Sequence, residues 1–152
     1  MRSWKSVLVL VVLIVAANVV LYQVFSAYRY RWIVIHHTAS PSDNYASIKH
    51  YHQKKHHWRD AGYHLILSNG STDVPLGHLE ATGRYTHLSY ALATRSPRHN
   101  LLGLHLCIVG NYEHKALPDD LQSALANVLV RLQETYHIPN DHILFHRDVG
   151  AE

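Results

Sequence analysis

The sequence predicts an α/β fold, in which helices pack on the faces of a central β-sheet, behind an N-terminal transmembrane or signal helix. Two observations predict it. Short apolar and β-branched runs alternate with segments whose apolar residues recur at helical spacing, and the first part of the chain is an almost unbroken apolar run. With 152 residues in all, we expect one domain over residues 29–152 and a separate N-terminal segment over residues 1–28.

The N-terminal segment has the length and polarity of a membrane span. Arg2 and Lys5 precede an apolar run over residues 7–21. Asn18 alone interrupts this run, which extends further to Phe25. Counted to Phe25, the run is about long enough to cross a bilayer, because a membrane-spanning helix needs roughly 17–25 residues. A secretory signal peptide also has a basic start and an apolar core. We favour an uncleaved membrane anchor, and in either case we expect the domain to face the periplasm or cell exterior, or to be secreted.

The domain begins with a predicted strand and a predicted helix. A β-branched run leads into His36 and predicts a strand over residues 33–36. Residues 40–43 then supply turn chemistry and helix N-caps. Aromatic and apolar side chains recur at helical spacing after this turn, so we expect a helix over residues 45–56.

A hairpin is the next predicted element. Asn69-Gly70 is a strong two-residue hairpin signal, so we expect strands on either side of it, over residues 63–67 and 72–76. Residues 77–100 show no firm period and predict a long loop region with room for one short helix.

The last part of the domain predicts a strand, a helix and a further strand. Residues 102–109 are nearly all apolar and predict a central strand, in which the only cysteine, Cys107, is a packed thiol. Pro118 marks a helix start, and apolar residues keep an i, i+3, i+4, i+7 register to Tyr136. Residues 143–146 form the last predicted strand and end in a histidine.

Two predicted strands that end in histidine indicate a composite site. His36 and His146 are far apart in the sequence, but each stands at the end of a strand, where a metal or substrate can reach it. A catalytic zinc is usually held by protein nitrogens plus an open position for water. The 15 histidines are otherwise scattered, which speaks against a metal-handling protein. The net charge of +3 is modest, and no basic helix or stacking platform indicates a nucleic-acid partner.

Five motifs occur in order along the chain: IVIHHTAS, DAGYHLIL, LHLCIVGNY, a P-x-x-L-Q helix start and ILFHRDVG. Together they span residues 32–150, and they resemble the zinc-dependent N-acetylmuramoyl-L-alanine amidases, a family that includes phage lysozyme-type amidases and peptidoglycan recognition proteins. The resemblance implies a central mixed β-sheet flanked by helices, a Zn²⁺ cofactor and a peptidoglycan or muropeptide partner. We expect a monomer that contacts the membrane through its N-terminal helix.

The resemblance also assigns roles to individual residues. His36 and His146 match the family's first two zinc ligands, and Tyr63 matches its catalytic tyrosine, which polarises the zinc-bound water and the oxyanion. His87 lies where the family often carries a histidine that contacts substrate. The implied reaction is zinc-dependent hydrolysis of the amide bond between N-acetylmuramic acid and L-alanine. His37 points to the opposite side of its strand and takes a supporting or packing role.

One departure from the family concerns the third zinc ligand. This ligand is a Cys or Asp about eight residues after the second histidine, which places it beyond residue 152. Cys107 cannot substitute, because it belongs to the middle of a different strand. We therefore expect either a C-terminally truncated piece of a longer amidase or a homologue with an incomplete metal site. The alternative function is a non-catalytic peptidoglycan-binding module, which the retained His36, Tyr63 and His146 argue against.

Overall fold

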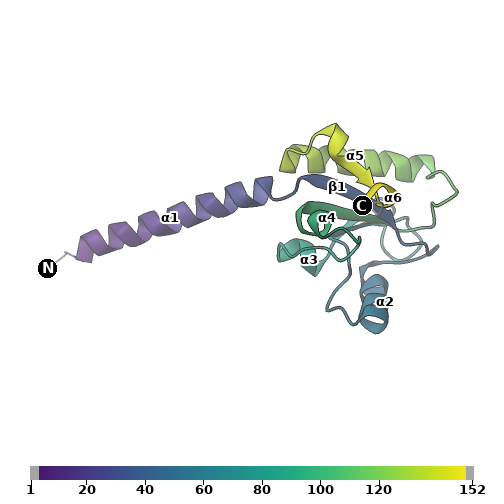
Figure 1. Ribbon diagram of the computed structural model, residues 1–152, viewed down its shortest axis with the longest axis horizontal. Helices are drawn as coiled ribbons and strands as arrows, with labels where there is room; N and C mark the ends of the chain where they lie inside the picture. The colour runs from purple at the N-terminus through teal and green to yellow at the C-terminus, as the bar shows by residue number, and fades with distance from the viewer. Residues whose placement is uncertain (1–3, 150–152) are drawn as a thin grey trace.

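A long apolar helix precedes the folded domain. In this computed structural model, which describes residues 4–149, α1 (Trp4–Tyr28) runs away from the domain as a rod (Figure 1). Its mean hydropathy reaches 2.7 and none of it is buried, so by length and composition it can cross a membrane; signal sequences share these properties. At its end Tyr28 stacks on His137, with ring centroids 5.0 Å apart. The apolar helix predicted from the sequence is therefore present.

The domain is built on one mixed sheet of five strands. The strand order is β3-β2-β4-β1-β5, with β3 antiparallel to β2 and all other neighbours parallel. The strands are β1 (Trp32–His37), β2 (Leu65–Leu67), β3 (Leu79–Ala81), β4 (Gly103–Ile108) and β5 (Ile143–Phe145). The predicted central mixed sheet flanked by helices is confirmed.

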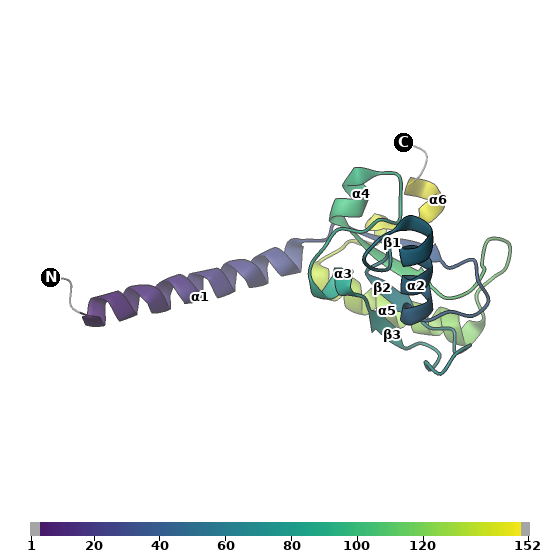
Figure 2. The same ribbon diagram turned by 90° about the horizontal axis from the view of Figure 1, so that it is seen from below.

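Helices cover both faces of this sheet. Figure 2 shows α2 (Tyr45–His56) in front of the strands and α5 (Asp119–Tyr136) behind them. The buried cluster on the α5 side includes Ile33, Ile35, Leu104, Leu106, Leu125 and Val128. The buried cluster on the α2 side consists of Ile48, Ala61, Ile66, Cys107 and Val109. Because successive side chains of a strand alternate between faces, His36 lies on the α2 side.

The two longest helices of the domain, α2 and α5, lie where their spacing predicted them. The Asn44 side chain accepts a hydrogen bond from the Ser47 N–H, and the Ser47 hydroxyl accepts one from the Asn44 N–H, so a capping box starts α2. The helix α5 follows Pro118 and carries two aspartates in its first turn, where acidic side chains suit the helix dipole. The predictions of a helix over residues 45–56 and of one from Pro118 to Tyr136 are confirmed.

The predicted return strand of the hairpin is wrong. Residues 72–76 form no strand, and β2 pairs with β3 instead. Pro75 has no N–H to donate to a strand ladder, which argues against pairing there. A wider loop replaces the tight hairpin, and the Ser68 N–H closes it by donating to the His78 carbonyl at 3.0 Å.

Several boundaries also differ from the predicted ones. Residues 77–100 contain β3, the short helix α3 (Gly83–Thr86) and the start of α4 (Pro97–Leu102), more than one short helix. The remaining short elements are η1 (Asn140–His142) and α6 (His146–Val149). The last strand stops at Phe145, because the Phe145 N–H donates to the Asp148 carboxylate at 3.0 Å and the chain turns into α6.

Candidate active site

The strands β1 and β5 bring His36 and His146 to the same edge of the sheet. They pair in parallel, with Ile35 opposite Phe145, so their carboxyl ends coincide. His36 is the penultimate residue of β1, and His146 directly follows β5. The two ring centroids lie 4.9 Å apart. His36 is buried, whereas His146 is exposed to solvent.

Burial keeps His36 a neutral imidazole. Only 5% of the residue is exposed, and this desolvation holds its pKa well below the usual value of 6.5. The neighbouring His105 and His146 lower the pKa further. A neutral imidazole has a nitrogen lone pair available for a metal ion, so no proton has to be displaced at neutral pH.

Tyr63 lies beside His36. Their ring centroids are 5.2 Å apart, and the Thr82 hydroxyl fixes the backbone of Tyr63 by donating to its carbonyl at 2.8 Å. Burial first, and then the adjacent Cys107 thiol, raise the pKa of Tyr63 well above 10. The phenol therefore keeps its proton at neutral pH and can donate a hydrogen bond to a substrate oxygen.

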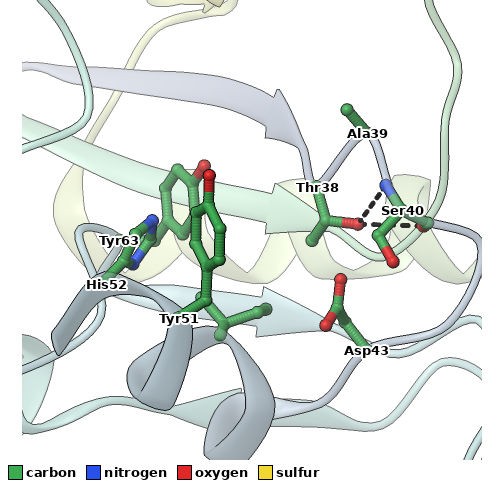
Figure 3. A pocket seen from close by; sticks show the side chains of 8 residues that line it. Thr38, Ala39, Ser40, Asp43, Tyr51, His52 and Tyr63 are labelled. Carbon is green, nitrogen blue, oxygen red and sulfur yellow. Dashed lines mark hydrogen bonds between the residues drawn. The ribbon is translucent and has the colours of Figure 1, made fainter. Parts of the chain in front are cut away.

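A cavity of about 500 Å³ opens beside Tyr63 on the α2 side. Figure 3 shows Tyr63 and His52 at one end, Asp43 and the loop after β1 at the other, and Tyr51 between them. The lining residues are Thr38, Ala39, Ser40, Asp43, Ile48, Tyr51, His52 and Tyr63. A concave site with aromatic walls and a few polar groups suits a ligand that carries both apolar and polar parts.

The described residues supply two nitrogen ligands for a metal ion. Imidazole nitrogens suit zinc, and the closeness of His36 and His146 allows both rings to serve one ion. Across residues 4–149, no group of three His, Cys, Asp or Glu side chains is placed to hold a metal. Cys107 is buried in β4, and burial raises the pKa of its thiol. The predicted third ligand, beyond residue 152, lies outside the described residues.

The structure does not bring His87 to this group of side chains. His87 is exposed at the end of α3, where its Nδ1 donates to the Gly83 carbonyl at 2.8 Å. In Figure 1 and in Figure 2, α3 lies toward the end of the domain that α1 joins, and α6 lies farther away. Substrate contact by His87 stays a prediction.

His105 is a buried neighbour of the site that the sequence interpretation did not include. Its Nδ1 lies 2.9 Å from the Nε2 of His36, and the two ring centroids are 5.1 Å apart. A signal for it was present, because His105 alternates with Leu104 and Leu106, which belong to the α5 side. Its partner, however, follows only from the pairing of β1 with β4.

One family matches most of the chain. The model of the N-acetylmuramoyl-L-alanine amidase family matches residues 26–151. The chain belongs to this family. The resemblance drawn from the five motifs is therefore confirmed.

Individual relatives of this amidase-family chain are more distant. Peptidoglycan recognition protein 1 of Bos indicus is 26% identical over 128 residues, which cover 78% of this chain and 63% of the relative. The chain thus spans less than two thirds of that relative's length. The endolysin amidase LysCS of Clostridium intestinale URNW superposes with a TM-score of 0.62 at 19% identity, covering 84% of this chain and 75% of that one. PGRP-SA of Apis mellifera superposes with a TM-score of 0.63 at 17% sequence identity, covering 82% of this chain and 74% of that one. These two likenesses show the fold.

Because this amidase-family chain buries neutral histidines, we expect its free energy of unfolding to decrease in acid. Burial lowers the pKa of His64 to about 3 and that of His105 to about 4, from the usual 6.5. As the pH falls below 6.5, the unfolded chain takes up protons that the folded domain does not. The free energy of unfolding should therefore decrease from pH 6.5 down to about 4, by up to about 1.4 kcal/mol per pH unit for each histidine.

Urea denaturation of the chain of residues 1–152 in detergent, at several pH values from about 7.5 to about 5, measures this slope. His64→Phe removes one of the buried groups and should make the slope shallower. A free energy of unfolding that does not change over this range would contradict the prediction, as would an unchanged slope in the His64→Phe variant.

Proposed function

We propose that this chain is a zinc-dependent N-acetylmuramoyl-L-alanine amidase, which hydrolyses the amide bond between N-acetylmuramic acid and L-alanine in peptidoglycan. The observation that carries the proposal is the closeness of the His36 ring to both Tyr63 and His146 in a chain of the amidase family, where Tyr63 also lines a cavity. Two imidazoles can supply two of the three protein ligands of a catalytic zinc, and a protonated phenol can donate a hydrogen bond to an oxyanion.

Each of these residues has a distinct task. His36 and His146 would hold the zinc with one nitrogen each, with a third ligand beyond residue 152. The chemistry that zinc supplies in such sites is polarisation of a carbonyl and a water whose pKa falls to about 7. Tyr63 donates a hydrogen bond to the amide oxygen as that oxygen gains negative charge, a contribution of roughly 3–4 kcal/mol for one donor.

The cavity and the N-terminal helix support the choice of substrate. The cavity has room for part of a muramyl peptide, and Tyr63, which lines it, lies beside His36, so a ligand bound there would reach toward the two histidines. A mutant of Drosophila PGRP-LB was solved in complex with tracheal cytotoxin, so a domain of this fold does accept a ligand. The helix α1, as an anchor or as a signal, would deliver the domain across the membrane to the side where peptidoglycan lies.

The experiment uses the chain of residues 1–152 in detergent, loaded with zinc and incubated with a defined muramyl peptide. Mass spectrometry should detect a free peptide that begins with L-alanine. Insoluble peptidoglycan is used in parallel to measure binding by co-sedimentation. If zinc is bound and no peptide is released, the amidase proposal is wrong.

A non-catalytic peptidoglycan-binding module is the second candidate. The observation that favours it is the absence of a three-ligand metal group within the part of the chain that the structure describes. Co-sedimentation with peptidoglycan, unaffected by a chelator and without any peptide release, would support this module. If the chain neither binds peptidoglycan nor releases peptide, both proposed functions are wrong.

A further inference from the structure

A short path of hydrogen bonds runs behind His36, away from the cavity. His36 Nε2 lies 2.9 Å from His105 Nδ1, and the other nitrogen of that ring, Nε2, lies 2.9 Å from the carbonyl oxygen of His99. His99 is the third residue of α4, so the path links β1 through β4 to this helix. Both His36 and His105 are buried, with 5% and 0% of their surfaces exposed.

The chemistry of this path fixes where its protons are. A carbonyl oxygen only accepts, so the Nε2 of His105 must carry a proton and donate it to His99. A neutral imidazole has one proton, so the Nδ1 of His105 carries only a lone pair. The short contact to His36 is then favourable only if His36 Nε2–H is the donor. The Nδ1 of His36 is left with its lone pair.

The surroundings hold His105 in this orientation. Its backbone N–H donates to the Nδ1 of His64 at 3.0 Å, and its carbonyl accepts from the His64 N–H at the same distance. Gly103 leaves the space that the path needs, because a Cβ there would lie 2.5 Å from the His99 carbonyl oxygen and 3.0 Å from the His105 Nε2. The His105 ring, which contacts His36 on one side and the His99 carbonyl on the other, therefore cannot easily flip so that its two nitrogens change places.

We propose that His105 is a positioning residue, which holds the proton of His36 on Nε2 and so makes Nδ1 the nitrogen that faces a metal ion. The outer partner of a metal-binding histidine normally fixes its tautomer and ring orientation in this way. Here that partner is a second histidine, anchored in turn on a helix carbonyl. The metal-binding part of the inference rests on the proposed function, whereas the tautomer is a property of the metal-free chain.

The first test needs neither zinc nor activity. The chain of residues 1–152 is labelled with ¹⁵N in histidine and kept in detergent with a chelator. Its imidazole ¹⁵N chemical shifts, assigned by single substitutions, report which nitrogen of each ring is protonated. We expect a proton on Nε2 of His36, a proton on Nε2 of His105, and a through-bond coupling between His36 Nε2 and His105 Nδ1. A His36 ring that is protonated on Nδ1, or that shows no such coupling, overturns the inference.

The second test separates positioning from packing. His105→Phe removes both ring nitrogens and should weaken zinc binding about 10–100-fold in a chelator competition, whereas His105→Asn keeps an acceptor near the Nδ1 position and should lose less. Leu67→Ala is the control for lost packing, since Leu67 is also fully buried in the sheet but belongs to the cluster on the α5 side. Equal zinc affinities for His105→Phe and Leu67→Ala would overturn the inference. If the wild-type tautomers are as expected and zinc does not bind, the proposed zinc amidase fails instead.

Discussion

His36→Ala is expected to remove amide hydrolysis almost completely, with a loss of at least about 10³-fold in kcat/KM. His36 is the more buried of the two imidazoles at the site, and its ring lies within about 5 Å of both Tyr63 and His146. Its loss would remove one proposed metal ligand and open space between the other two side chains. Polarisation by a bound metal contributes several kcal/mol to transition-state stabilisation, so most of the rate enhancement should be lost when the metal is lost.

The measurement combines activity with metal content. Zinc per chain after gel filtration should fall together with the rate of peptide release from the muramyl peptide. His114→Ala is the matched control, because His114 is exposed in the loop between β4 and α5, and it should keep both zinc and activity. If His36→Ala retains its zinc and hydrolyses the substrate at the wild-type rate, the proposed metal site is wrong.

Tyr63→Phe is expected to have the second largest effect, a decrease of about 10²–10³-fold in kcat with little change in KM. A phenol is protonated at neutral pH, and burial raises the pKa of Tyr63 further, so the substitution would remove the proposed hydrogen-bond donation to the developing oxyanion. Removal of one hydroxyl leaves the ring packing beside His36 unchanged. Zinc content should therefore stay at the wild-type level.

The comparison of kcat with KM distinguishes this role from simple substrate binding. Tyr90→Phe removes the hydroxyl of an exposed tyrosine outside the cavity and should leave both constants unchanged. A Tyr63→Phe variant that raises KM but keeps kcat would place Tyr63 in substrate binding rather than in catalysis.

The sequence predicted the elements that depend on local spacing and missed those that depend on distant partners. The helix over residues 45–56 has its cap and its apolar face within one segment, so its bounds were readable. The partner of β2 was misplaced because Asn69-Gly70 turns the chain inside a wider loop that closes at Ser68 and His78. Ser96-Pro97 was an unused local signal for α4, where Ser96 is the N-cap.

The residues of the candidate site show the same contrast between local signals and distant partners. The motifs indicated His36, His146 and Tyr63, and the parallel pairing of β1 with β5 explains why two of them meet. His105 is different, because its relation to His36 depends on burial, on strand register and on the carbonyl that its second nitrogen faces. The alternation of residues along a strand shows on which face of the sheet His105 lies. It does not show that His36 is its partner, nor which ring nitrogen carries the proton.

The strand order has a consequence for when this protein can fold. The central strand β1 lies between β4 and β5, and Ile33 pairs with Ile143 near the other end of the chain. Contacts of such large sequence separation form late and slowly, because the loop entropy is lost before the pairing stabilises the sheet. If α1 leads the domain across a membrane, β1 crosses before β5 and stays unpaired on that edge until residues 143–145 have followed. The candidate site, which needs both β1 and the residue after β5, would in that case be assembled only after the last strand has crossed, so the proposed amidase could not act before export.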